Sequence, residues 1–198
     1  MRIKSHWFKS GRQRTPQEIA GALAFVIWRI GGNALKNTRN ANFEIAVGIQ
    51  YFSFLTELLI FLVQTADRIA YRQLSAEDRL AFTSALANRV AETLAENQSR
   101  LVGNSFEINK QHFIDKLNRR AGEYAEFDYG INGPEFAFTR YLGFCIREVM
   151  DEKDANWVID QMMSITAPEA VEMVEKTMHD LFDAEPKQSR SRNSVSGD

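Results

Sequence analysis

The chain has 198 residues, of which 44% are hydrophobic and 25% are charged, and its formal net charge is −2. This composition is typical of a soluble globular protein, and the length suits one domain with tails. The single cysteine, Cys145, excludes an intramolecular disulfide and a cysteine-rich zinc site.

The charges are unevenly placed along the chain. Residues 1–39 hold eight basic side chains and one acidic side chain, whereas residues 40–183 hold 13 basic and 23 acidic ones. This asymmetry suggests that the start of the chain seeks an anionic partner, either a nucleic acid or an anionic membrane surface. The alternative is that it lies on the acidic body of the chain itself or of a second copy. The basic side chains expected to meet such a partner are Arg2, Lys4, Lys9, Arg12 and Arg14.

The first helix has a clear start signal. Thr15-Pro16-Gln17-Glu18 combines an N-cap threonine, a proline at the first helical position and a glutamate at the capping-box position. We expect this helix to end near Gly31-Gly32 or to continue to about Lys36. Residues 37–42 then form a polar turn.

Residues 45–63 are long and apolar enough to raise the question of a membrane span. Against a span stands Glu57, because an acidic side chain at the centre of a spanning helix costs roughly 2.5 to 3.5 kcal/mol. At 100° per residue, Gln50, Glu57, Gln64 and Arg68 fall within about 40° of one another. This narrow polar stripe favours the central helix of a soluble bundle, from about Phe43 to about Arg72, over an integral membrane span.

Helix signals continue to the end of the chain, and strand signals are poor. Further helices are expected at residues 75–101, 109–124, 134–150, 154–163 and 167–182. The fold is therefore predicted to be all-α, a single irregular or orthogonal bundle of six or seven helices without a sheet. Its organisation is a basic N-terminal arm (1–14), an all-helical domain (15–183) and a disordered polar tail (184–198).

The polar stripe has two interpretations. It is either the exposed edge of an amphipathic helix, which we favour for Glu57, or a set of groups that faces a cavity or a subunit interface. In the second case Phe54 and Phe61 would form apolar walls, and Trp28 and Arg29 of the preceding helix could reach the site. The candidate ligand-binding residues are Gln50, Phe54, Glu57, Phe61, Gln64, Arg68, Trp28 and Arg29.

Catalysis has little support, because the sequence contains no phosphate-binding loop, dinucleotide fingerprint or nucleophile elbow. The three histidines lack the spacing of a di-iron site, so we expect no metal and no cofactor. The aromatic and acidic residues of 123–138 suit partner binding or, alternatively, close the end of the bundle. The leading hypothesis is a cytoplasmic, non-enzymatic protein that acts through protein contacts as a homodimer. The alternatives are a small-molecule binder or enzyme with a pocket near Gln50 and Glu57, and peripheral binding through the basic arm.

Overall fold

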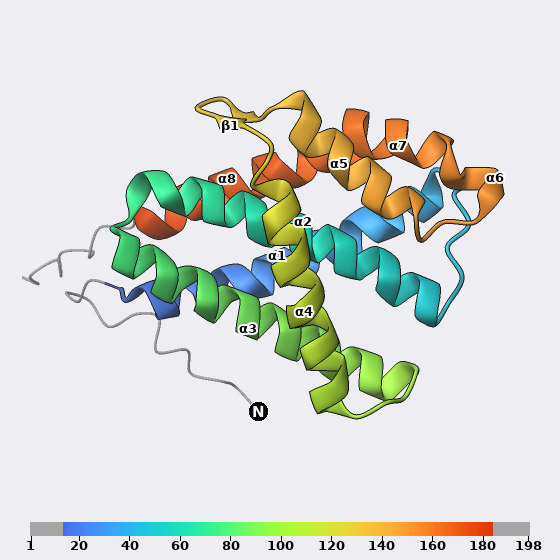
Figure 1. Cartoon of the computed structure of the whole chain (residues 1–198), viewed down its shortest axis with the longest axis horizontal. Helices are drawn as coiled ribbons and strands as arrows, with labels where there is room; N and C mark the ends of the chain where they lie inside the picture. Colours follow the sequence, from blue (N-terminus) through green and yellow to red (C-terminus); the bar gives the residue numbers. More distant parts are fainter. Residues whose placement is uncertain (1–13, 184–198) are drawn as a thin grey trace, which may run out of the picture.

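The computed structural model describes residues 14–183, and this part of the chain is an all-α bundle, as the sequence predicted (Figure 1). Its helices are α1 (Pro16–Asn40), α2 (Ile49–Gln73), α3 (Ala76–Leu101), α4 (Phe106–Tyr124), α5 (Phe136–Arg147), α6 (Glu152–Ala155), α7 (Trp157–Gln161) and α8 (Ala167–Phe182). A π-helical turn, η2 (Met162–Thr166), makes α7 continuous with α8. One small departure from the prediction is a hairpin of β1 (Tyr129–Gly130) and β2 (Gly133–Pro134), which lies where a loop was expected.

Helix α1 begins as predicted but ends later. The Thr15 hydroxyl accepts a hydrogen bond from the Glu18 amide at 3.2 Å, and the Thr15 amide donates to the Glu18 carboxylate at 2.9 Å. The predicted end near Gly31 is wrong. This glycine lies inside α1, at the point where α1 packs against α2. A β-carbon at Gly31 would lie 3.0 Å from Leu59 Cδ2 and 3.1 Å from Leu55 Cδ1. Because Gly31 has no side chain, α2 can approach α1 closely at this position, and α1 continues past it.

The central helix α2 starts at Ile49 rather than near Phe43. Residues 41–48 contain two backbone positions that a helix does not allow, since φ is 67° at Asn42 and 103° at Gly48. Asparagine and glycine are the residues that accept this left-handed region most readily. The apolar residues before Gly48 therefore belong to a connection, in which Ile45 is buried and Val47 is exposed.

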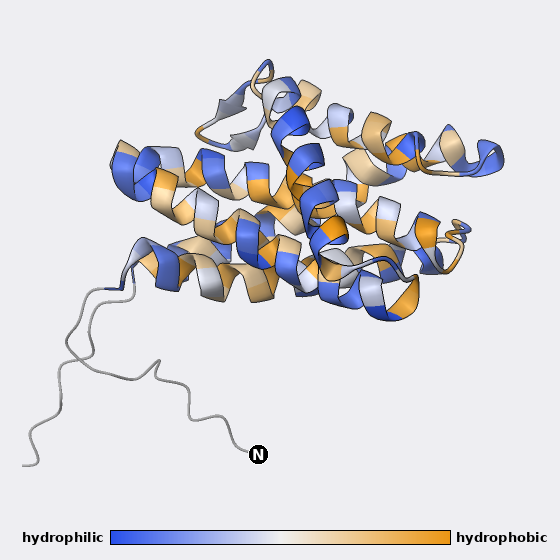
Figure 2. Cartoon of the chain, turned by 60° about the horizontal axis from the view of Figure 1, so that its bottom comes forward, coloured by the Kyte–Doolittle hydropathy of each residue, from blue (hydrophilic) through white to orange (hydrophobic). Residues whose placement is uncertain are grey.

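The bundle surrounds α2 with helices from both halves of the chain. Helices α1, α3 and α8 pack around it, and α4 crosses α2 and α3 steeply in Figure 1. Helices α5 and α7 pack against each other above α2 in the same view. Apolar and polar residues alternate along each helix in Figure 2, as expected of amphipathic helices that share one core.

Two predicted helix starts move, one because of a helix cap and one because of the hairpin. Helix α4 begins at Phe106, since the Ser105 hydroxyl accepts a hydrogen bond from the Ile108 amide at 3.2 Å. Helix α5 begins at Phe136, because Pro134 pairs with Tyr129 in the hairpin. Ser75 caps α3 in the predicted place, and Gly103 follows the end of this helix with φ of 98°.

Helices α1 and α2 are long and apolar enough to cross a membrane by length and composition alone. In the most apolar 18-residue stretch of α1, 50% of the stretch is buried inside the bundle, and in the corresponding stretch of α2, 72% is buried. Core helices of soluble proteins also satisfy this test, so the result is weak evidence for a span.

Candidate functional site

The most unusual polar group of the core is the carboxylate of Glu57, at the middle of α2. Glu57 is 2% exposed, so the expectation that it lies on an exposed edge is wrong. Helix α4 crosses α2 over this position and places two basic side chains on the carboxylate. The apolar surroundings therefore hold a charge that is paired, as buried charges generally are.

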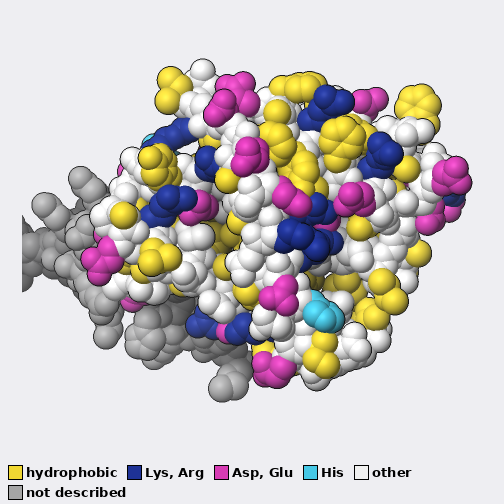
Figure 3. Space-filling model, in the orientation of Figure 1, with side chains coloured by type: hydrophobic (Ala, Val, Ile, Leu, Met, Phe, Trp, Pro, Cys, Tyr) yellow, Lys and Arg dark blue, Asp and Glu magenta, His cyan; other side chains and the backbone are white. Residues whose placement is uncertain are grey.

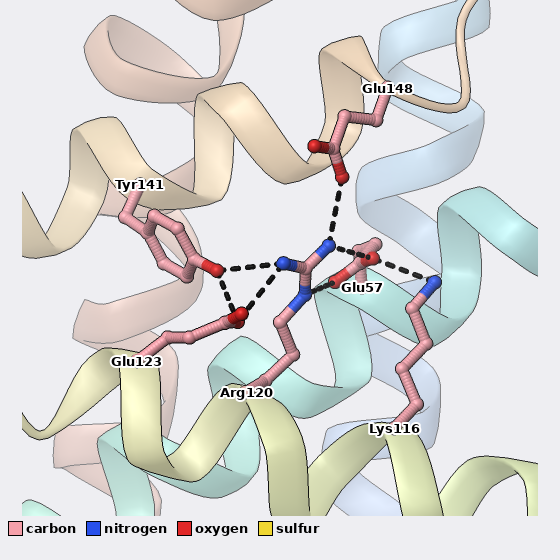
Figure 4. A network of polar contacts seen from close by, with 6 residues as sticks. All are labelled: Glu57, Lys116, Arg120, Glu123, Tyr141 and Glu148. Carbon is pink, nitrogen blue, oxygen red and sulfur yellow. Dashed lines mark hydrogen bonds and ion pairs between the residues drawn. The ribbon is translucent and has the colours of Figure 1, made fainter.

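Arg120 and Lys116, both from α4, bind the two oxygens of Glu57 (Figure 4). Arg120 donates from Nε to Glu57 Oε2 at 3.1 Å and from Nη2 to Oε1 at 2.8 Å. Lys116 Nζ lies 2.7 Å from the same Oε1. This fork-to-fork geometry is the strongest arrangement that arginine and a carboxylate can form.

The guanidinium of Arg120 extends the cluster to α5. Its Nη1 donates to Glu123 at 3.0 Å and to the Tyr141 hydroxyl at 2.7 Å, and its Nη2 donates to Glu148 at 3.0 Å. The Tyr141 hydroxyl in turn donates to Glu123. We call Glu57, Lys116, Arg120, Glu123, Tyr141 and Glu148 the Glu57 cluster.

The electrostatics of the cluster favour its ionised form. Burial alone lowers the pKa of Arg120, but the hydrogen bonds and negative charge of Glu57 outweigh it and hold that pKa above its ordinary value. Burial also acts to raise the pKa of Glu123. Hydrogen bonds from Tyr141 and Arg120 outweigh this effect, so the pKa of Glu123 lies below its usual range. Arg120 is therefore a permanent cation shared among three carboxylates.

This arrangement leaves little room for chemistry at Glu57. Both carboxylate oxygens already accept hydrogen bonds from cations, so neither is free to act as a general base. Within residues 14–183 no group of three or more His, Cys, Asp and Glu side chains converges in a way that could hold a metal. The cluster is suited to fastening α4 and α5 to α2.

The other members of the polar stripe also fasten the second half of the chain to α2. The Gln50 amide donates to the Val149 carbonyl at 3.1 Å and to Asp151 at 3.3 Å, just after α5. Arg68 donates to the Tyr124 carbonyl at 2.9 Å, at the end of α4. Gln64 lies half-buried between them.

Arg72 continues the stripe by donating to the Tyr129 carbonyl at 2.7 Å, in the hairpin. The predicted stripe is therefore a line of polar contacts between α2 and the later part of the chain, from α4 to the segment after α5. Glu57 and Arg68 contact α4, Gln50 contacts the segment after α5, and Arg72 contacts the hairpin.

The proposed apolar walls of a ligand pocket are part of the core. Phe54 and Phe61 are both fully buried, and the ring of Phe61 lies 5.6 Å from that of Phe138. Arg29 is exposed and stacks 5.9 Å from the ring of Phe25 on its own helix. In the described part of the chain neither Arg29 nor the half-buried Trp28 hydrogen-bonds to the stripe. The eight candidate residues therefore do not surround one pocket.

The aromatic segment 123–138 divides into buried and exposed rings. Tyr124 and Phe138 are core residues, with ring centroids 4.7 Å apart. The ring of Phe136, in contrast, is 65% exposed on the outward side of α5.

Phe136 begins a row along the exposed face of α5. Arg140 lies between two rings, with its Cζ 6.0 Å from the centroid of Phe136 and 5.1 Å from that of Phe144. Arg147 lies one turn further on, and Trp157 is exposed on the neighbouring α7. We call these five residues the α5–α7 surface. Figure 3 shows hydrophobic and basic side chains together along this edge of the molecule.

The basic arm lies almost wholly outside the described residues. Arg2, Lys4, Lys9 and Arg12 are not described. Arg14 is described, and its guanidinium donates to the Leu181 carbonyl at 3.3 Å, which joins the start of the helical domain to α8.

The reactivity of the sole cysteine tests whether solvent reaches the core beside the Glu57 cluster. Cys145 is 1% exposed, and burial, assisted by the charge of Glu57, raises the pKa of its thiol to about 12. Because only the thiolate reacts, we expect modification by Ellman's reagent at pH 8 to be about a thousandfold slower in native protein than in protein unfolded by guanidinium. Equal rates in the two states would contradict the burial of this thiol.

The fold and the Glu57 cluster define an all-α bundle whose two halves are joined through a buried ion-pair network. Comparison with known proteins finds no family model, no curated protein and no solved structure that matches the chain significantly. The proposals below therefore rest on the residues of this chain alone.

Proposed function

We propose that this chain is a non-enzymatic helical protein with a regulatory or adaptor role, acting through protein contacts as a homodimer. The observation that supports this proposal most directly is the α5–α7 surface. Exposed aromatic rings beside arginines are the side chains most enriched at the energetic centres of protein interfaces.

The charges of this surface suit association with a second copy. Within residues 14–183 neither Arg140 nor Arg147 forms an ion pair with a carboxylate. Glu135 precedes α5 and Asp160 lies on α7, and both are exposed. A two-fold interface pairs a patch with itself, so the arginines of one copy would meet the acids of the other.

We also propose that the protein works in the cytoplasm without an integral span. The burial of α2 inside the bundle supports this, since a core helix needs no lipid to cover its apolar faces. The Glu57 cluster supports it further, because it satisfies the one buried charge of that helix.

We expect light scattering at about 50 µM to give the mass of a dimer. Replacing Phe136 and Trp157 together by serine should give a monomer, because both side chains are exposed and supply two of the three aromatic rings of the α5–α7 surface. The matched control is Leu101→Ser, which changes an equally exposed side chain at the end of α3 and should leave the dimer intact. A wild-type monomer at this concentration would refute the homodimer. A dimer that survives the double substitution would refute this surface as its interface.

A further inference from the structure

The exposed face of α5 carries aromatic rings and arginines in alternation. A ring, an arginine, a ring and an arginine follow one another at spacings of four, four and three residues, and they are Phe136, Arg140, Phe144 and Arg147. At 100° per residue all four lie within about 80° of one another, on one side of the helix. The remaining exposed residue of α5 is Ala137, whose small side chain allows another helix to approach this row closely.

This alternation makes the row complementary to itself when it is reversed. Read backwards from the end of α5, the order becomes arginine, ring, arginine, ring. Two such helices packed antiparallel therefore place a ring of one copy opposite an arginine of the other copy at every step. If the same helices packed parallel and in register, arginine would face arginine, and like charges in contact are unfavourable.

The spacings allow the antiparallel pairs to form around a two-fold axis. If the axis passes beside Leu142, Arg140 lies at the same height as Phe144 of the second copy, because the two positions are equally far from the axis. Phe136 and Arg147 of the second copy then differ in height by only about 1.5 Å, one residue of helical rise. The axis repeats both pairs, so the contact contains four pairs of a ring and an arginine.

Both arginines and both rings are available for such pairs. Within residues 14–183 neither Arg140 nor Arg147 forms an ion pair. Phe136 is 65% exposed and Phe144 is 37% exposed, so each ring keeps surface for a guanidinium of a second copy. A guanidinium is weakly hydrated and stacks on aromatic faces, and its attraction to a ring strengthens when water is removed between two copies.

From this self-complementarity we infer that the homodimer forms by antiparallel packing of α5 against α5 of a second copy. Arg140 of each copy stacks on Phe144 of the other, and Arg147 of each copy stacks on Phe136 of the other. The inference rests on the proposed homodimer and deepens it by assigning the partner element and its register.

A double-mutant cycle on Phe136 and Arg147 tests this register. The two residues lie about 16 Å apart along α5, so any coupling between them has to cross the interface. Sedimentation equilibrium of the full-length chain gives the dimer Kd of wild type, Phe136→Ala, Arg147→Ala and the double variant. We expect each single variant to raise Kd at least about tenfold. The double variant should raise Kd at least about tenfold less than the product of the two single effects, because either change already removes the pair.

An exchange of the two residues provides an independent test. Phe136→Arg places two arginines opposite each other across the interface and should raise Kd at least about tenfold. Adding Arg147→Phe restores a ring opposite an arginine and should return Kd to within about threefold of the wild-type value. The matched control is Arg29→Ala, because Arg29 stacks on an exposed ring of its own helix in the same way, with its Cζ 5.9 Å from the centroid of Phe25. This control should leave Kd unchanged.

The outcomes separate the register from the homodimer itself. If the effects of the two single variants multiply, or if the exchange does not rescue Phe136→Arg, the antiparallel register is overturned while the homodimer stands. A wild-type chain that stays monomeric at about 50 µM overturns both. All four side chains of the row are exposed, so the substitutions test association without removing any part of the core.

Discussion

Replacing Glu57 by alanine is expected to lower the free energy of unfolding by about 3 to 5 kcal/mol, the range measured when one partner of a buried ion pair is removed. The substitution leaves Arg120, which is 8% exposed, in the core without the carboxylate that binds it through two hydrogen bonds. Urea denaturation of the variant beside wild type measures the change.

The matched control for this prediction is a second glutamate in an exposed ion pair. Glu92 lies 3.1 Å from Lys110 and 3.2 Å from Arg89, and all three side chains are partly or largely exposed. Glu92→Ala should cost about 1 kcal/mol or less, because water solvates the charges that it leaves behind. Equal losses for Glu57→Ala and Glu92→Ala would show that the Glu57 cluster is no more costly to break than a surface pair.

A double substitution separates the pair from the rest of the cluster. Glu57→Leu together with Arg120→Met removes both charges and restores apolar contacts at the crossing of α2 and α4. Such exchanges are often neutral or stabilising. We therefore expect the double variant to lose less stability than the two single variants added together, which thermodynamic cycles measure.

Phe61→Ala is expected to have an effect of similar size, about 3 to 5 kcal/mol, for a different reason. Phe61 is fully buried, with its ring 5.6 Å from that of Phe138 and 6.3 Å from that of Tyr124. Truncation removes the apolar contacts of Phe61 with α4 and α5 and leaves a cavity that the neighbouring helices fill only partly.

The matched control for Phe61 is Phe25→Ala. Phe25 is 64% exposed on α1, so its loss should change the free energy of unfolding by about 0.5 kcal/mol or less. A comparably small effect at Phe61 would instead support the hypothesis that this ring forms the wall of an open pocket.

The fold was largely predictable because its signals are local. The capping box at Thr15 and the cap at Ser75 lie within one helical turn of the residues they bind. Some errors came from local caps and turns that the sequence did not make plain, and one came from a distant contact. Gly31 has the appearance of a helix end in the sequence, but it allows α1 to approach Leu55 and Leu59 of α2.

The candidate site was predictable only in part. The sequence placed Glu57 on a polar stripe, but spacing along one helix does not show what a second helix brings to it. One signal for the partner was present. Phe113, Leu117, Arg120 and Tyr124 follow the spacing of an inward helix face, and Arg120 is the charged member of that face. An arginine in such a position requires a buried acid, and α2 contains one at its centre.

The ion pair also limits how α4 can be aligned along α2. A slide of α4 by one helical turn moves its side chains by about 5.4 Å, and apolar faces tolerate such a slide because one aliphatic contact replaces another. At Glu57 a slide in one direction would bring Glu123 and Tyr124 in place of Arg120, and a slide in the other direction would leave only Lys116, which lacks the two-pronged guanidinium. The buried carboxylate therefore selects a single register from several that hydrophobic packing alone would leave close in energy.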